Sequence, residues 1–356
     1  MAINYSTKYA SKVAERFHLK SITDDDCGKG YSFLGPASRT IRIYSVDTVP
    51  ETQYQREGDA RFGTTYDVGD TLQEMTCTQQ PAFSFTIDRL DGSDQAIQKS
   101  AGKALRRQLD EVTIPNIDKY RIKKWALGGN IVVPSGEAPT KATIGEKIID
   151  LNAAMTDALV PLDDRTLYIS TAMYKLLKLN PDWLGVDALG RETLQKGVVG
   201  EFDGCRVKPI PTSYMPKGVY FFIKRKGSTV DPVKLAQYDV LPKVKGFGGP
   251  VVQGVTYHDA FVLGAKADGI AMCGSADAIL TAPEVTGSSG SYTFESSGAT
   301  KFYYTTDGTN PRYSLTRKET TSTATVQSNE TTRIVAVKIE GGDVVAVSPE
   351  TVKAYA

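Results

Sequence analysis

Histidine and cysteine are scarce in this chain of 356 residues. The two histidines, His18 and His258, lie about 240 residues apart, so imidazole chemistry is poorly supplied. The four cysteines lie at least about 50 residues apart, at Cys27, Cys77, Cys205 and Cys273. This spacing contains no CxxC pair, which argues against a zinc motif and a disulfide framework and suits a reducing compartment. We therefore expect no bound metal and no cofactor.

The chain also has no large excess of charge of one sign and no long uninterrupted apolar run. The 42 Lys and Arg residues face 41 Asp and Glu, for a net charge of +1, so any contact with nucleic acid would have to be local. The longest candidate for a membrane span, residues 261–280, is interrupted by Lys266 and Asp268. The N-terminus has no apolar signal segment. We expect a soluble chain made in the cytosol, with no membrane partner.

The motifs of common enzymes are absent as well. The Gly-Lys pairs at 28–29 and 102–103 are not followed by Ser or Thr, and residues 246–250 lack the third glycine of a dinucleotide loop. Asp163 and Asp164 could form a hydrolase pair, but their place before a strand favours a loop. His258 is expected to be a hydrogen-bonded strand histidine, and Asp24–Asp26 a turn rather than a calcium loop. We predict no catalytic residue and no enzyme.

The first 20 residues predict an amphipathic arm. Basic residues recur at every fourth position beside an apolar stripe, at Lys8, Lys12, Arg16 and Lys20. Such a stripe is either the solvated face of a surface helix, or an arm that contacts a second subunit or nucleic acid.

Two alternating segments, residues 40–46 and 83–87, predict strands that we interpret as the arms of a long hairpin. The intervening residues 47–70 have few aliphatic side chains and many charged or turn-forming ones. Such a segment cannot fill a core, and an isolated two-stranded ribbon is marginally stable in water. The hairpin therefore needs cover from outside its own subunit.

The middle of the chain predicts a mixed α+β region. A helix of about five turns is expected from residue 97 to 112, with an interruption at Pro115 and a second part that ends at Gly128-Gly129. Further helices are expected at 143–159 and 172–179, and strands at 166–170, 206–211, 219–224, 256–262 and near Ala271. The short loops favour a mixed or antiparallel sheet.

Near Gly274 the chain becomes richer in Ser and Thr. Runs that alternate apolar and polar residues follow, at 291–295, 301–305 and 332–338. Turn signals at Asp307-Gly308, Asn310-Pro311 and Gly341-Gly342 separate these runs. The pattern predicts a separate immunoglobulin-like β-sandwich over residues 276–356.

The order of these segments resembles the tailed-phage major capsid proteins of the Hong Kong 97-type fold. The residues that carry the likeness are Phe62–Asp70, Phe83–Asp88, Arg106–Glu111 with Pro115–Tyr120, and Gly200–Gly204 with Val207–Pro211. The resemblance implies an α+β capsid fold with an N-terminal arm (1–38), an extended β-hairpin loop (39–90), and a peripheral domain with a spine helix plus an axial domain (91–275). Within the last part it implies a peripheral domain from 91 to about 160, together with the last strands, and an axial domain from about 165 to 262.

The same resemblance implies a viral structural protein that self-assembles as hexamers and pentamers into an icosahedral shell. Its partners would be other copies, a portal, possible scaffolding protein and packaged double-stranded DNA, and its location the virion after assembly in the host bacterial cytoplasm. As inter-subunit contacts we single out five charged residues: Arg56, Arg61, Asp70, Arg106 and Asp110.

Residues 276–356 resemble the immunoglobulin-like module at the C-termini of chitobiase and hexosaminidase-type glycosidases, through Ala299–Pro311 and Thr332–Val337. The resemblance implies an outward decoration with weak glycan contact through Tyr304 and Asp307. Core burial of Tyr304 and a plain turn at Asp307 are favoured over that contact. The alternative function is a carbohydrate-binding cell-surface adhesion protein, with the β-domain as its glycan site.

Overall fold

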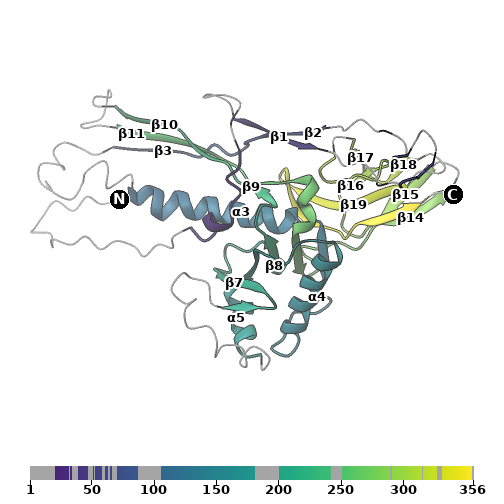
Figure 1. Cartoon of the computed structure of the whole chain (residues 1–356). Coiled ribbons are helices and arrows are strands. Elements are labelled where there is room, and N and C mark those ends of the chain that lie inside the picture. Colours follow the sequence, from purple (N-terminus) through teal and green to yellow (C-terminus); the bar gives the residue numbers. More distant parts are fainter. Residues whose placement is uncertain are drawn as a thin grey trace, which may run out of the picture.

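The computed structural model describes residues 21–31, 33, 39–46, 51, 53–57, 61–62, 65, 70–86, 106–180, 200–241, 251–288, 291–314, 316–326 and 331–354 (Figure 1). The basic stripe at Lys8, Lys12, Arg16 and Lys20 lies outside these residues, as do residues 97–105 of the helix predicted from 97 to 112. None of the helices in the described ranges is long and apolar enough to cross a lipid bilayer.

A long helix occupies the middle of the molecule (Figure 1). A π-helical turn, η2 (Leu109–Thr113), leads directly into α3 (Ile114–Gly128). Pro115 stands in the first turn of α3, and the amide of Ile114 donates to the carbonyl of Leu109, five residues back. The wider π turn accommodates a residue that has no N–H to donate. The chain therefore stays helical through Pro115, and the predicted interruption takes the form of a π turn rather than a break.

A six-stranded mixed sheet lies on one side of α3, in the order β4-β13-β8-β5-β7-β6. These strands are β4 (Ile131–Pro134), β5 (Arg165–Ser170), β6 (Glu201–Phe202), β7 (Cys205–Ile210), β8 (Val219–Arg225) and β13 (Ile270–Gly274). β4 pairs parallel with β13, and β5 pairs parallel with β7 but antiparallel with β8. The prediction of a mixed sheet is confirmed.

Two helices pack on this sheet, α4 (Ile144–Asp157) and α5 (Thr171–Lys178). The apolar stripe of α4 is fully buried, at Ile144, Ile148, Leu151 and Met155. The helices expected at 143–159 and 172–179 are thus confirmed. β4 and α4 precede residue 160 and belong to this sheet and its core, and the division into peripheral and axial domains stays a prediction.

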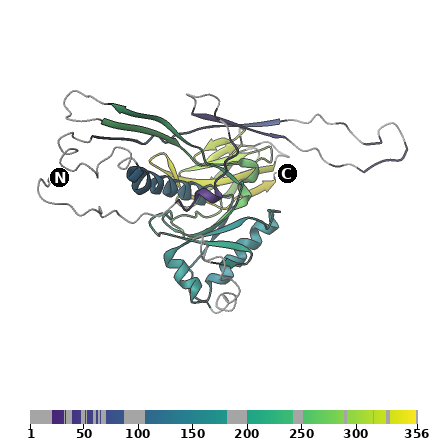
Figure 2. The same cartoon turned by 60° about the vertical axis from the view of Figure 1, so that its left-hand side comes forward.

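The predicted hairpin pairing is wrong. β1 (Thr40–Val46) pairs antiparallel with β2 (Asp70–Thr76), whereas β3 (Ala82–Thr86) pairs with β11 (Val251–His258), which in turn pairs with β10 (Val233–Leu241). The adjacent polar residues Gln73 and Glu74 interrupt the period-two pattern in β2, so alternation did not reveal this strand. The two thin sheets extend from opposite sides of the body (Figure 2).

The C-terminal region is a two-sheet β structure. One sheet contains β14 (Glu284–Ser288), β15 (Ser291–Glu295) and β18 (Thr323–Thr325). The other contains β17 (Lys318–Thr320), β16 (Lys301–Thr305), β19 (Thr331–Glu340) and β20 (Asp343–Val347), and β21 (Thr351–Ala354) also pairs with β19. Phe294, Phe302 and Ile334 from the two sheets share one buried core. The smaller elements are η1 (Asp24–Asp26), β9 (Thr229–Val230), β12 (Phe261–Val262) and η5 (Gly264–Gly269).

Candidate assembly surfaces

The segment that follows the N-terminal arm is anchored on the long helix. Asp118 of α3 accepts hydrogen bonds from Ser21 Oγ at 2.8 Å, from the Ile22 amide at 2.8 Å and from Thr23 Oγ1 at 2.6 Å. Asp118 is buried, so its carboxylate is satisfied by this segment rather than by water. Arg121, one turn later, also donates to Thr23 Oγ1.

A buried ion pair fixes the next residues to the six-stranded sheet. Lys208 Nζ of β7 lies 2.7 Å from Asp26, and Tyr168 of β5 donates its hydroxyl to the same carboxylate at 2.6 Å. Burial alone would raise the pKa of Asp26, but the hydrogen bonds from Lys208 and Tyr168 outweigh it and lower that pKa. Lys224 Nζ lies over the Trp125 ring and donates to the backbone carbonyl of Asp26. Burial lowers the pKa of this lysine.

A third buried carboxylate completes the anchor. Asp231 accepts from Trp125 Nε1 at 2.7 Å and from the Gly28 amide at 3.2 Å. A Cβ at Gly28 would lie 1.8 Å from the Thr229 carbonyl, so only glycine permits this approach. These contacts therefore hold residues 21–28 in one position between α3 and the six-stranded sheet.

The end of the β1–β2 hairpin is exposed throughout its described part. The nine described residues between 51 and 65 are all exposed, and Tyr54 and Phe62 retain 54% and 83% of their accessible surface. The two rings meet edge to face with centroids 5.2 Å apart. The base of the hairpin is different, because Ile41 and Met75 are buried. An aromatic pair at the end of a projecting ribbon is a surface suited to burial against another molecule.

The five charged residues predicted at subunit contacts fall on two elements. Arg56 and Arg61 are exposed near the hairpin end, and the backbone of Asp70 begins β2 opposite Val46. Arg106 lies 3.6 Å from Asp110 at the start of the long helix, in a pair four residues apart. The structure does not bring the two sets together within one subunit, and their role between subunits stays a prediction.

The residues considered for other chemistry have structural partners. Asp163 pairs with Arg225 and Asp164 with Arg206. The His258 amide donates to Gln79. His258 lies on a strand as expected; its buried ring packs against Tyr120, and the ring Nδ1 has no hydrogen-bond partner among the described residues. No group of three or more His, Cys, Asp or Glu that could hold a metal ion occurs among the residues that the structure describes.

The residues considered for glycan contact lie in the core and in a turn. Tyr304 is 7% exposed and packs on Phe294 at 5.6 Å between centroids. Asp307 accepts hydrogen bonds from Thr309 and Thr316 within its own turn. These positions agree with the core and turn interpretation that the sequence favoured.

The C-terminal sandwich is fastened to the end of α3. The Arg312 guanidinium donates to the carbonyls of Leu127 and Gly129, and the Tyr313 hydroxyl donates to that of Gly128. These are the orphan carbonyls of a helix C-terminus, where a cation is also favoured by the helix dipole. Val337 of β19 belongs to the same buried core as α3. Sequence analysis missed this contact, because no local pattern joins residues about 185 positions apart.

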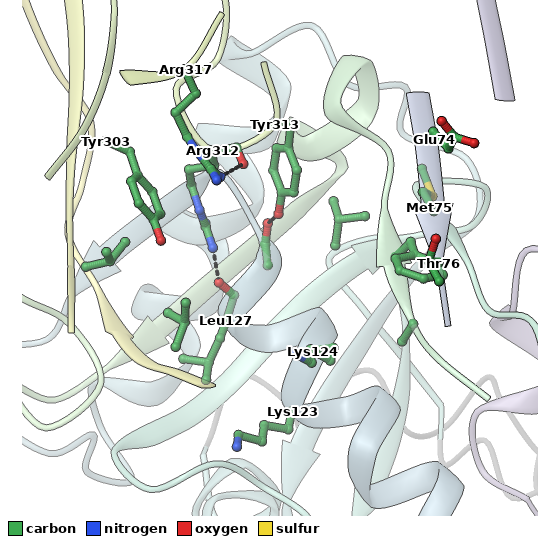
Figure 3. Close-up of a pocket in the computed structure, with 16 residues that line it drawn as sticks. Glu74, Met75, Thr76, Lys123, Lys124, Leu127, Tyr303, Arg312, Tyr313 and Arg317 are labelled. Atoms are coloured by element: carbon green, nitrogen blue, oxygen red, sulfur yellow. Dashed lines mark hydrogen bonds between the residues drawn. The ribbon is translucent and has the colours of Figure 1, made fainter. Parts of the chain in front are cut away.

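A cavity of about 460 Å³ opens beside this contact (Figure 3). Four parts of the fold line it: the base of the hairpin at Glu74–Thr76, the last two turns of α3, residues 260–262 at β12, and the sandwich. Figure 3 shows Arg312 reaching across to Leu127, with Tyr313 beside it and with Lys123 and Lys124 one helical turn before Leu127.

The solved structures that are similar to this chain include several from phages. A structure from Mycobacterium phage Che8 is 14% identical with a TM-score of 0.57, and the match covers 75% of this chain and 96% of that chain. The capsid structure of cyanophage P-SCSP1u is 12% identical with a TM-score of 0.60, and the match covers 76% of this chain and 93% of that chain. The mature capsid of bacteriophage PhiM1 is 11% identical with a TM-score of 0.55, and the match covers 76% of this chain and 91% of that chain.

No protein-family model and no curated protein matches the chain. At these identities the likeness to solved structures concerns the fold. The matches leave about a quarter of this chain uncovered, which is about the share that residues 276–356 occupy. This chain has the Hong Kong 97-like fold of phage capsid proteins, with a β-sandwich at its C-terminal end.

Proposed function

We propose that this chain is the major capsid protein of a tailed phage, which assembles as hexamers and pentamers into an icosahedral head shell around double-stranded DNA. One observation carries the proposal: a capsid fold bears a hairpin whose described outer residues are all exposed, including two aromatic rings. Because such a ribbon is marginally stable in water, it gains stability when another subunit covers it.

Apolar burial would supply most of the assembly energy. Complete burial of a Phe side chain contributes about 1.5–3 kcal/mol, whereas an exposed ion pair contributes about 0–1 kcal/mol. Tyr54 and Phe62 should therefore matter more than Arg56, Arg61, Asp70, Arg106 or Asp110 taken singly. These charged residues would set the orientation of neighbouring subunits rather than the strength of their contact.

The proposal extends to partners and location. The basic stripe of the N-terminal arm would face the packaged DNA without base specificity, and the shell would join a portal and, where needed, a scaffolding protein. Assembly would take place in the host cytoplasm, and the mature protein would belong to the virion. The chain would have no enzymatic role, in keeping with a structural shell protein.

The C-terminal sandwich would lie on the outer surface, in line with its resemblance to the chitobiase-type module. Its face away from α3 would be the one open to host-surface glycans. Glycan-array binding by the assembled full-length chain tests this part separately, and arrays without signal would reject it.

Expression of the full chain in bacterial cytoplasm, followed by sedimentation and electron microscopy, tests the main proposal. We expect closed polyhedral particles from the wild-type chain. A Tyr54→Ala, Phe62→Ala double variant should raise the concentration needed for assembly by at least about tenfold. Val352→Ala is the matched control, because Val352 is 61% exposed on β21 and far from the hairpin end in sequence. A wild-type chain that remains monomeric at high concentration would contradict the proposal.

A further inference from the structure

We infer that the cavity between the hairpin base, α3 and the sandwich receives the hairpin end of a second copy of this chain. The inference rests on the proposed function and adds a role for residues 276–356: the sandwich forms part of the receiving site for the neighbouring subunit.

The cavity has an apolar interior and a basic rim. Apolar side chains from four elements line it: Leu127 from α3, Val262 from β12, Val337 from β19 and Val344 from β20. Among the described residues that line it, four are basic, Lys123, Lys124, Arg312 and Arg317, and one is acidic, Glu74. Glu74 is already paired with Arg42 across the hairpin at 3.1 Å. The rim therefore favours an occupant that combines acidic groups with an apolar anchor.

Several of these cations already have one partner and keep donors to spare. Lys123 and Lys124 both contact Asp343, at 2.8 and 3.4 Å, so two ammonium groups share one carboxylate. Arg317 pairs with Glu319 at 3.0 Å and lies 4.3 Å from the centre of the Tyr303 ring. An incoming carboxylate would find these donors preoriented, which lowers the entropic cost of binding.

Charge selects one segment of the chain as the occupant. Residues 1–20 carry four basic residues and one acidic residue, so the rim repels them. Residues 47–70 carry six acidic residues and two arginines. Glu51 and Glu57 flank Tyr54, so this segment offers both carboxylates and exposed rings. A cavity of about 460 Å³ is within the size range of about 300–1,000 Å³ that proteins use for small ligands, and it can accept aromatic side chains.

Geometry requires that this segment come from another copy. Glu74–Thr76 at the base of β2 line the cavity, and the hairpin leaves the body from that point. The seven residues of β2 span about 20 Å in the extended conformation. Figure 2 shows the β1–β2 ribbon directed away from the body, so the end of the hairpin does not return to the cavity at its own base.

Thiol cross-linking in assembled particles tests the inference. Gln55→Cys places a thiol beside Tyr54 without removing either ring, and Val344→Cys places one in the cavity wall. Both positions are in described parts of the chain. The four native cysteines are all buried, at 6% exposure or less, so background reaction is small. With a short bis-maleimide, we expect the double variant to form a ladder of covalent oligomers on a denaturing gel.

The control pairs Gln55→Cys with Val352→Cys, on the same sandwich but outside the cavity lining. That pair and each single variant should give a ladder at least about tenfold weaker. Intact particles without the 55–344 ladder, a cross-link confined to the monomer band, or an equal ladder in the control would each overturn the inference and leave the capsid proposal standing. A wild-type chain that forms no particles would instead reject the proposed function.

Discussion

The buried pair of Asp26 and Lys208 offers a sharp test of how the N-terminal segment is held. Asp26→Asn preserves the shape of the side chain but leaves Lys208 buried without the carboxylate that lies 2.7 Å away. Removal of one partner from a buried pair costs about 3–5 kcal/mol. The matched control is Asp25→Asn, because Asp25 contacts the same lysine at 3.9 Å but is 82% exposed, and should change stability by less than about 1 kcal/mol.

Urea unfolding followed by tryptophan fluorescence measures this difference. Lys224 Nζ lies 4.2 Å from the centre of the Trp125 ring, so Trp125 reports on the anchor directly once Trp183→Phe removes the other indole. With an m-value of about 2–3 kcal/mol/M, Asp26→Asn should lower the midpoint by about 1–2 M. Equal midpoints for Asp26→Asn and Asp25→Asn would refute the argument.

The same pair predicts a dependence on pH. The pKa of Asp26 is lower in the folded chain than its ordinary value of 3.8, so the unfolded chain binds the proton more tightly. The stabilisation is therefore complete above about pH 4 and is lost as the pH falls through the lower folded value. The wild-type midpoint should fall more steeply than that of Asp26→Asn below pH 4, and parallel curves would contradict this.

Three further changes are predicted. Arg312→Ala removes two charge-assisted bonds to helix carbonyls and should cost at least about 2 kcal/mol by calorimetry, whereas Arg317→Ala should cost about 0–1 kcal/mol. Gly28→Ala places a Cβ 1.8 Å from the backbone carbonyl oxygen of Thr229 and should lower the free energy of unfolding by about 1–3 kcal/mol, whereas Gly30→Ala meets nothing within 4 Å and should change it little. Burial raises the pKa of the Cys27 and Cys205 thiols to about 12 and that of the Cys77 and Cys273 thiols to about 11. Ellman's reagent at pH 8 should therefore react with none of these thiols until the chain unfolds.

Elements with a strong local pattern could be predicted from the sequence. The stripe of α4 and the alternating residues of β16 each follow a single period, and each forms the expected element. The change in composition near Gly274 likewise marked the start of the β-sandwich, because Ser and Thr with alternating apolar residues suit two exposed sheets.

The remaining features depend on contacts between distant residues. The partner of β1 is a strand with adjacent polar residues, so only pairing across the hairpin identifies it. Asp26 resembled a turn residue, and its buried role depends on Lys208, about 180 residues later. The capping of α3 by Arg312 and Tyr313 also has no local signal, since the helix ends at Gly128 without a basic residue in its last turn.

A cryo-electron microscopy reconstruction of particles formed by the full chain tests the central claim most directly. We predict that residues 47–70 of each subunit lie across the adjacent subunit, with Tyr54 and Phe62 buried at that contact. Particles in which this hairpin folds back on its own subunit, with both rings open to solvent, would contradict it.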